Sequence, residues 1–224
     1  MTWQTLRPAA KELSIATICL VIALAGAFLA ASFTSDKNIF QLAHPQGGEP
    51  DTFPVGQRLD LHRTFFTAWA ALILVTPALC TFLFRRNSES AARYWLAFWT
   101  VSFLAFLVHF YWAVVVLFGN DWHRIFQAHA RVSAPIPDTI VMVWWGVDVM
   151  LAWLMQSEKT WVRVQRMVVH LAVLVLFFLG SALQGELVWS RAIGYAMGAA
   201  VLASVIYWFI LKTRTPTLGR AQSA

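Results

Sequence analysis

The chain has 224 residues, of which 59% are hydrophobic and 12% are charged. A soluble globular domain has about 45–50% apolar and ~25% charged residues, so the composition excludes an ordinary soluble domain and indicates a membrane protein. The net charge of +6 does not indicate nucleic-acid binding, because the location of charges matters more than their sum in such a chain. Cys19 and Cys80 lie in separate apolar runs and predict neither a disulfide framework nor a metal site.

Six apolar runs, each near the ~20 residues that cross a bilayer, predict an all-α polytopic bundle of six transmembrane helices joined by short loops. The first run is longer than the ~7–15 residues of a signal-peptide core, so we expect it to be an uncleaved span. A polar N-terminus (1–12) and a polar tail (212–224) flank the transmembrane domain (13–211). The expected spans are 13–33, 64–84, 94–118, 139–155, 167–183 and 192–211.

The basic residues predict the orientation. With six spans, both termini and the second and fourth turns share one side, and these segments carry 11 Lys and Arg residues against six in the other loops. The positive-inside bias therefore predicts that both termini are cytoplasmic, in a bacterial-type plasma (inner) membrane.

Ionisable residues inside spans are costly and indicate a functional site by default. His109 lies in the third span, roughly 4–5 Å outward of its middle by helical rise, and Asp148 lies near the centre of the fourth. Because these spans are sequence neighbours, we expect them to pack antiparallel and His109 to hydrogen-bond to Asp148. Such a pair predicts a catalytic or proton-handling site, whereas the alternative is a polar contact that only joins two helices, worth ~0.6 kcal/mol.

Aromatic residues accompany this pair at helical spacing. Trp112 and Trp145 are candidates for lining a cofactor pocket, although tryptophan also favours membrane boundaries. His170 is expected about 12 Å inward of His109 by helical rise. One haem iron needs both axial ligands at the same depth, which disfavours a bis-histidine haem; His170 is interpreted as an interfacial or packing residue.

The outer loops hold imidazoles and carboxylates, which are ligands for zinc, copper and non-haem iron. Their spacing matches no metal motif, so the metal prediction is weak, and the alternative is a solvated loop with local charge pairs. The segment 121–133 is also predicted as a short surface helix that would cover the His109 site, an arrangement suited to a quinone head group or to a simple loop anchor. The metal candidates are His62, His123, His129, Asp60 and Asp121.

Gly194 and Gly198 form a Gly-x-x-x-Gly motif in the last span, which predicts close helix packing, within the bundle or against a protein partner or second copy through 192–211. The leading functional hypothesis is a small membrane subunit of a larger redox or lipid-linked assembly. One alternative is an intramembrane enzyme or a metal- or quinone-binding oxidoreductase with an outward-opening His/Asp site. The other is a proton-coupled carrier of small molecules. Whether the chain is an enzyme stays open, and no nucleic-acid partner is expected.

Overall fold

The computed structural model describes residues 8, 10–34, 55–127, 135–155, 159–185 and 188–214. Within these ranges the secondary structure is helical, without strands, and six helices are long and apolar enough to cross a membrane. The predicted all-α bundle of six spans is therefore confirmed, and the chain is a multi-pass membrane protein. The elements are α1 (Ala10–Thr34), α2 (Val55–Phe82), α3 (Glu89–Tyr111) with the π-helix η3 (Trp112–Leu117), α4 (Trp122–Gln127), α5 (Pro135–Leu154), α6 (Thr160–Phe178) with the π-helix η4 (Leu179–Leu183), and α7 (Val188–Arg214).

The six long helices begin earlier than the expected spans, whereas their ends agree more closely. Acidic residues occupy the first turns of α1, α3 and α5, at Glu12, Glu89 and Asp138. A carboxylate interrupts an apolar run but is favourable at a helix N-terminus, where the helix dipole is positive. A prediction from apolar runs alone therefore places the first residues of these helices too late in the sequence. α2 continues as one helix through Pro77.

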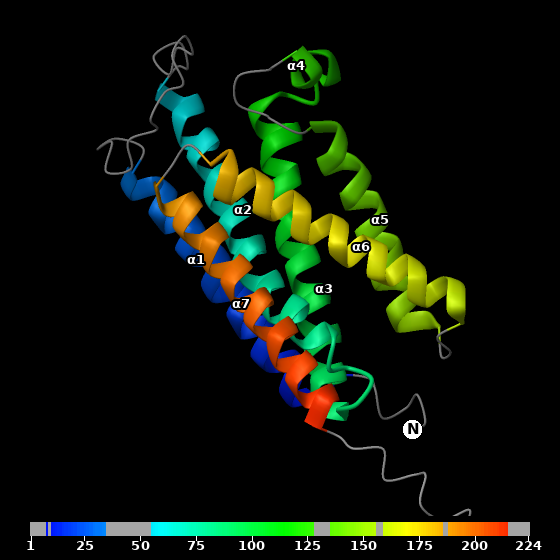
Figure 1. The fold of residues 1–224 in the computed structure, drawn as a ribbon. Coiled ribbons are helices and arrows are strands. Elements are labelled where there is room, and N and C mark those ends of the chain that lie inside the picture. The colour runs from blue at the N-terminus through cyan, green and yellow to red at the C-terminus, as the bar shows by residue number, and fades with distance from the viewer. Residues whose placement is uncertain are drawn as a thin grey trace, which may run out of the picture.

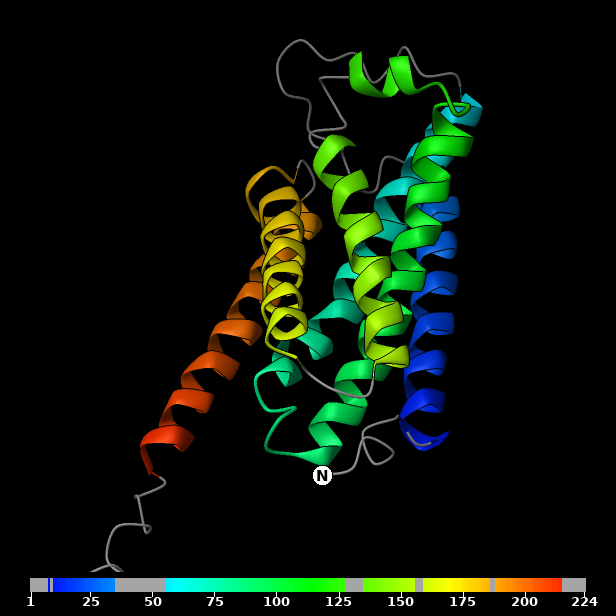
Figure 2. The same ribbon diagram turned by 90° about the vertical axis from the view of Figure 1, so that its right-hand side faces the viewer.

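The helices α2 and α3 lie at the centre of the bundle and pack along one another. α1 contacts both of them, α5 packs on α3, and α6 packs on α5. α7 lies against α2 and η4. α1 and α7 overlap in Figure 1, but Figure 2 shows them on opposite sides of the central helices.

The bundle has two different ends. The helix α1 starts and the helix α7 finishes at one end, called the terminal end, and α4 lies at the other, called the α4 end. The C-terminal half of α7 leans away from the other helices (Figure 2). Large aromatic side chains fill the centre of the bundle, and among them Trp99 and Trp145 are fully buried.

The Gly-x-x-x-Gly motif mediates close helix packing within the chain. A Cβ atom at Gly194 would lie 2.7 Å from the backbone nitrogen of Ala182, and one at Gly198 would lie 2.7 Å from the Phe178 ring. Both glycines therefore allow α7 to approach η4 and the end of α6. Packing between this motif and a second protein stays a prediction.

Candidate functional site

The carboxylate of Asp148, in α5, is fully buried at the centre of the bundle. The indole Nε1 of Trp99 in α3 donates to Asp148 Oδ2 at 2.9 Å. The guanidinium of Arg166 in α6 donates through Nε to Asp148 Oδ1 at 3.3 Å, and only 3% of Arg166 is exposed. A carboxylate away from water needs such compensation, since an unpaired charge there is costly. The ion pair joins α5 and α6, and the hydrogen bond from Trp99 links both to α3.

His170 extends the same cluster. Trp95 Nε1 donates to His170 Nε2 at 2.8 Å, and His170 Nδ1 lies 2.7 Å from the carbonyl oxygen of Arg166. An indole N–H can only donate and a carbonyl can only accept. His170 is therefore the neutral tautomer with its proton on Nδ1, and both of its nitrogens are occupied.

Aromatic rings enclose this histidine. Its ring is stacked between Phe82 and Trp99, with centroids 3.9 Å and 3.7 Å away. The guanidinium carbon of Arg85 lies 3.8 Å from the Phe82 ring centroid, an arrangement favourable for a cation above an aromatic face. The buried donors and acceptors of Asp148 and His170 already have partners, so this cluster is suited to holding four helices together rather than to binding a ligand.

His109 lies elsewhere, and the expected His109–Asp148 hydrogen bond is absent from the described structure. His109 Nδ1 lies 2.9 Å from the carbonyl oxygen of Thr64 in α2. Asp148 is level with Trp99, which precedes His109 by ten residues and therefore by ~15 Å along α3. Both α3 and α5 begin earlier than expected. His109 therefore lies farther towards the α4 end than predicted, and Asp148 lies farther towards the terminal end. The predicted pairing geometry is wrong, while a catalytic role for either residue stays untested.

His109 instead lines a small pocket at the α4 end, between the end of α3, α4 and the start of α5. Its volume is about 30 Å³, room for only one or two water-sized groups. The polar side chains in its lining are His109, Asp138 and Thr139, and the others are apolar: Phe110, Ala113, Val114, Phe118, Trp122 and Ile125. The predicted surface helix is thus present in part as α4, and Trp122 and Ile125 on it close one side of the pocket.

The pocket offers two hydrogen-bond acceptors. Because Nδ1 of His109 donates to a carbonyl, Nε2 carries the lone pair of the neutral ring. Within the described residues, neither this nitrogen nor the carboxyl of half-buried Asp138 has a hydrogen-bond partner. A group that donates hydrogen bonds is the chemical complement of this pair.

The other predicted site residues do not gather. Asp60 pairs with Arg63 at 3.0 Å, and His62 Nδ1 lies 3.0 Å from the Thr34 hydroxyl. Asp121 precedes α4 and His123 lies on it, both exposed, and His129 is outside the described residues. No three His, Cys, Asp or Glu side chains in the described ranges are grouped as metal ligands. The metal hypothesis gains no support from the four described candidates.

The two tryptophans proposed as pocket-lining residues also lie apart from one another. Trp112 packs on Phe28 and lies under the guanidinium of Arg63, with its ring centroid 4.9 Å from that group. Trp145 is buried against Trp99, with ring centroids 4.7 Å apart. Neither residue lines the pocket that contains His109.

The sequence prediction missed Asp138 as the companion of His109 and Arg166 as the partner of Asp148. Arg166 and His170 are four residues apart and share one face of α6 with buried Val173 and Phe177. This spacing was a usable signal. It was missed because Arg166 was assigned to a loop. Asp138 likewise lies one residue before an expected span, 139–155.

Comparison with family models, with curated proteins and with solved structures finds no match to the chain. The functional conclusion below therefore depends on the geometry of the chain itself.

Proposed function

We propose that this multi-pass membrane protein binds the head group of a membrane-soluble, hydrogen-bond-donating ligand of the quinol class, as a membrane subunit of a larger redox or lipid-linked assembly. The observation that carries the proposal is the pocket at the α4 end. It combines an apolar, aromatic lining with His109 and Asp138 as acceptors.

The lone pair on His109 Nε2 favours a quinol over a quinone. A quinone carbonyl only accepts, whereas a quinol hydroxyl donates to an imidazole nitrogen or to a carboxylate. Histidine and carboxylate side chains are also the groups that accept protons from a bound ligand. The pocket therefore matches the hydroxyl-bearing form of the ligand.

The size and lining of the pocket suggest how the ligand would bind. A volume of about 30 Å³ accommodates one hydroxyl group rather than a whole ring. The ring of the ligand would then lie against the aromatic side chains of the lining, where Phe110, Phe118 and Trp122 provide contact area. Aromatic stacking of this kind contributes about 0.5–1.5 kcal/mol for each ring pair.

The proposed role as a subunit is based on α1 and α7, the two spans that are least buried within the chain. In α1 and α7 only 11% of the most apolar window is buried within the chain, compared with 56% in α2. Lipid or the helices of a partner would cover these surfaces. A stoichiometric partner that copurifies in mild detergent would support a subunit role, and a ligand-binding protein that purifies alone would contradict it.

The binding proposal is tested with purified full-length protein and a short-chain quinol, using quenching of tryptophan fluorescence as the readout. We expect His109→Phe and Asp138→Leu each to weaken binding about tenfold, because each removes one hydrogen bond to the ligand. His62→Phe is the matched control, since it changes a histidine at the same end but outside the pocket. It should alter the affinity by less than about twofold.

A ligand-side comparison does not depend on the folding of any variant. The dimethyl ether of the same quinol keeps its ring but has no hydroxyl donor. We expect it to bind the wild-type protein at least about tenfold more weakly. Equal affinity for the quinol and its ether, or unchanged binding in both pocket variants, would refute the proposal.

A further inference from the structure

The helix α4 covers the pocket that contains His109, called the quinol pocket. In Figure 1 and in Figure 2 this helix lies across the end of the bundle, beyond the end of α3 and the start of α5. Trp122 and Ile125 of α4 form part of the pocket lining. The volume of about 30 Å³ has room for a hydroxyl group, and the lining residue Phe118 is buried. The ring of a quinol can therefore lie against Phe118 only if one wall of the pocket moves.

Two consecutive residues with positive φ connect α4 to the bundle. The φ angle is 63° at Gly119 and 61° at Asn120, and Asn120 is the one non-glycine residue with a positive φ in the described part of the chain. Such left-handed residues end a helix and turn the chain, and asparagine tolerates this conformation better than most residues. The hinges of moving segments are a few residues at the ends of elements, which absorb large changes in φ and ψ. Gly119 and Asn120 are therefore suited to act as the hinge of α4.

The bundle side of this hinge is anchored to the π-helix η3, a kind of helix that is frequent at functional sites. The backbone N–H of Asn120 donates to the carbonyl oxygen of Val114 at 2.8 Å. The backbone N–H of Phe118 donates to the carbonyl oxygen of Ala113 at 3.3 Å. A rotation about ψ of Asn120 changes the direction of α4 and keeps both of these bonds. It breaks the bond from the Asp121 N–H to the Phe118 carbonyl oxygen, which is 3.2 Å long.

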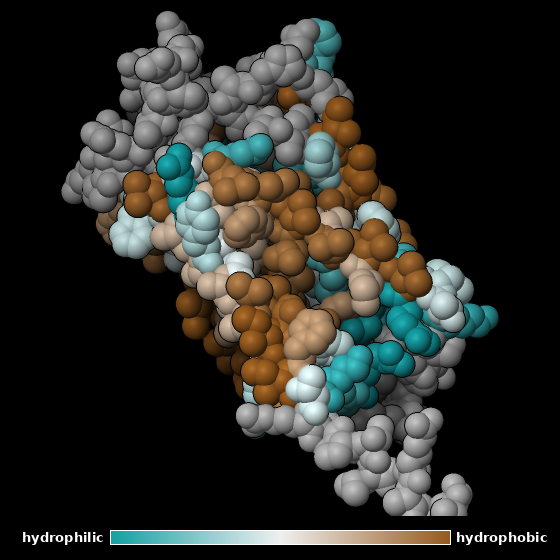
Figure 3. All heavy atoms as spheres, viewed as in Figure 1, coloured by the Kyte–Doolittle hydropathy of each residue, from teal (hydrophilic) through white to brown (hydrophobic). Residues whose placement is uncertain are grey.

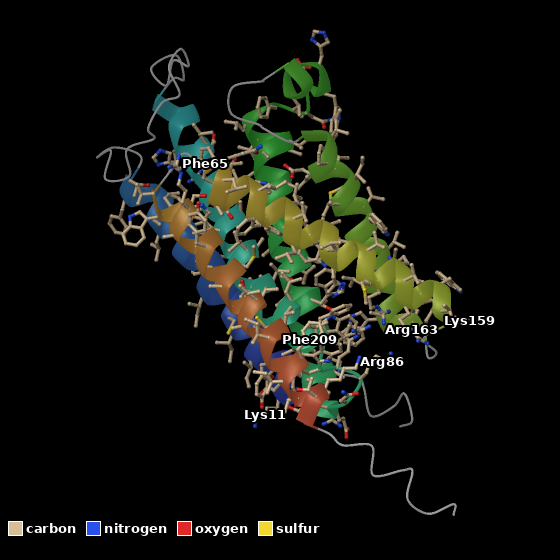
Figure 4. All side chains as sticks on the ribbon, in the orientation of Figure 1. Lys11, Phe65, Arg86, Lys159, Arg163 and Phe209 are labelled. Atoms are coloured by element: carbon tan, nitrogen blue, oxygen red, sulfur yellow. The ribbon has the colours of Figure 1, made fainter. Side chains whose placement is uncertain are left out.

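Ile125 holds α4 against the bundle. Its side chain is 3% exposed, whereas Trp122 and His123 on the same helix are exposed. In Figure 3 the visible surface of α4 that faces away from the bundle is hydrophilic. Ile125 packs in a small apolar cluster, and Phe65 of α2, labelled in Figure 4, lies against this cluster at the α4 end. The buried members of the cluster are Leu61, Val114, Leu117, Phe118 and Ile125.

This cluster is separate from the main apolar core, which contains Trp99 and Trp145. Segments with few buried apolar contacts open at a lower free energy than the core of a protein. The release of Ile125 therefore frees α4 without unpacking the central helices.

We propose that α4 is a lid that opens at Gly119 and Asn120, admits the ring of the quinol and closes over it, so that opening limits the rate of binding. The inference rests on the proposed function for the identity of the ligand. Trp122, which is exposed and also lines the pocket, forms part of the wall that moves. Closure of a lid excludes water from a bound ligand. A ligand that enters only the open state binds no faster than the lid opens.

The movement of α4 is tested first without any ligand. In purified full-length protein carrying Cys19→Ala and Cys80→Ala, Val114→Cys places a thiol at a buried position of the pocket wall, and its reaction with N-ethylmaleimide is timed. We expect Ile125→Ala to accelerate this reaction about tenfold, because the loss of a buried side chain destabilises the closed state. Ile125→Val removes less of the side chain and should accelerate it about threefold.

Two controls separate opening of the lid from general loosening of the bundle. Ile140→Ala removes the same atoms at the same end, but from an exposed position of α5 that does not line the pocket. It should change the reaction of the cysteine at 114 by less than about twofold. Gln184→Cys places a thiol at an exposed position of the same end. Ile125→Ala should leave the reaction of that cysteine unchanged.

The second measurement is the rate of quinol binding, followed by stopped-flow quenching of tryptophan fluorescence. We expect the observed rate to level off as the quinol concentration rises, and Ile125→Ala to raise the plateau about tenfold. A quinol that fails to bind would refute the proposed function, and the labelling results would still decide whether α4 opens.

The lid is overturned by any of three results. One is an equal reaction rate of the cysteine at 114 in Ile125→Ala and in Ile140→Ala. Another is a parallel acceleration at positions 114 and 184, which would indicate that the whole bundle loosens. The third is a binding rate that stays proportional to the quinol concentration, because opening would then not limit entry.

Discussion

At the scale of single residues, the most constrained group is the carboxylate of Asp148. Both of its oxygens accept hydrogen bonds, one from an indole and one from a guanidinium. A buried ion pair adds little net stability compared with apolar residues of the same shape. The removal of one partner is nevertheless expensive, because the other charge is left without compensation.

We therefore expect Asp148→Asn to lower the free energy of unfolding by about 3–5 kcal/mol. The double variant Asp148→Asn/Arg166→Gln should lose less than the sum of the two single losses, with a coupling energy of about 0.5–3 kcal/mol. Denaturation of the protein in mixed detergent micelles, followed by circular dichroism, measures all three variants. Additive losses in this double-mutant cycle would show that the two side chains do not interact in the folded protein.

At the scale of helices, the sequence predicts the number and type of the elements but not their exact depth. α3 begins at Glu89 rather than at residue 94, and α5 at Pro135 rather than at residue 139. His109 is therefore about 9 Å beyond the middle of its span towards the α4 end. Asp148 is about 5 Å beyond the middle of its span in the other direction. The errors in depth of the two antiparallel helices add. Their sum separates His109 from Asp148, which the sequence predicts to lie about one helical turn apart.

Helix faces could be predicted more reliably than helix depth. The buried positions Trp95, Trp99 and Phe106 share one face of α3, and Trp145 and Asp148 share one face of α5. Periodicity fixes which residues share a face, whatever the starting residue of the helix. The residue of a neighbouring helix that contacts this face is determined by the depth and tilt of both helices. Sequence periodicity gives no information on either. The buried face of α6 that carries Arg166 could therefore be predicted, but its pairing with Asp148 could not.

The glycines of α7 provide a test of helix packing. A Cβ atom at Gly194 would approach the backbone of η4, which cannot move aside as a side chain can. We expect Gly194→Ala to lower the free energy of unfolding by about 1–3 kcal/mol through overpacking. Gly26→Ala in α1 is the matched control, because no atom lies within 4 Å of its Cβ position. It should be neutral or stabilising by up to about 1 kcal/mol.

Detergent-induced unfolding of the two alanine variants, compared with the wild-type protein, measures the difference. If Gly194→Ala were as stable as Gly26→Ala but changed the oligomeric state, the motif would act between chains rather than within one. Gly198→Ala should be milder than Gly194→Ala, since its nearest neighbour is the Phe178 ring, which can shift.

At the scale of the whole molecule, the distribution of charge gives the bundle two different ends. The turn after α2 and the start of α6 lie at the terminal end together with the start of α1 and the end of α7. These are the segments whose Lys and Arg residues outnumber those of the other loops by 11 to six. The structure thus supports the grouping of loops on which the orientation prediction depends, while the orientation itself stays a prediction.

Labelling of single cysteines tests that orientation. In a chain carrying Cys19→Ala and Cys80→Ala, we introduce Asn87→Cys at the terminal end or Gln184→Cys at the α4 end, both at exposed positions. The positive-inside bias predicts a cytoplasmic terminal end. A membrane-impermeant maleimide added to intact cells should therefore label the cysteine at 184 at once, and the cysteine at 87 only after the membrane is opened. The reverse pattern would turn the quinol pocket towards the cytoplasm.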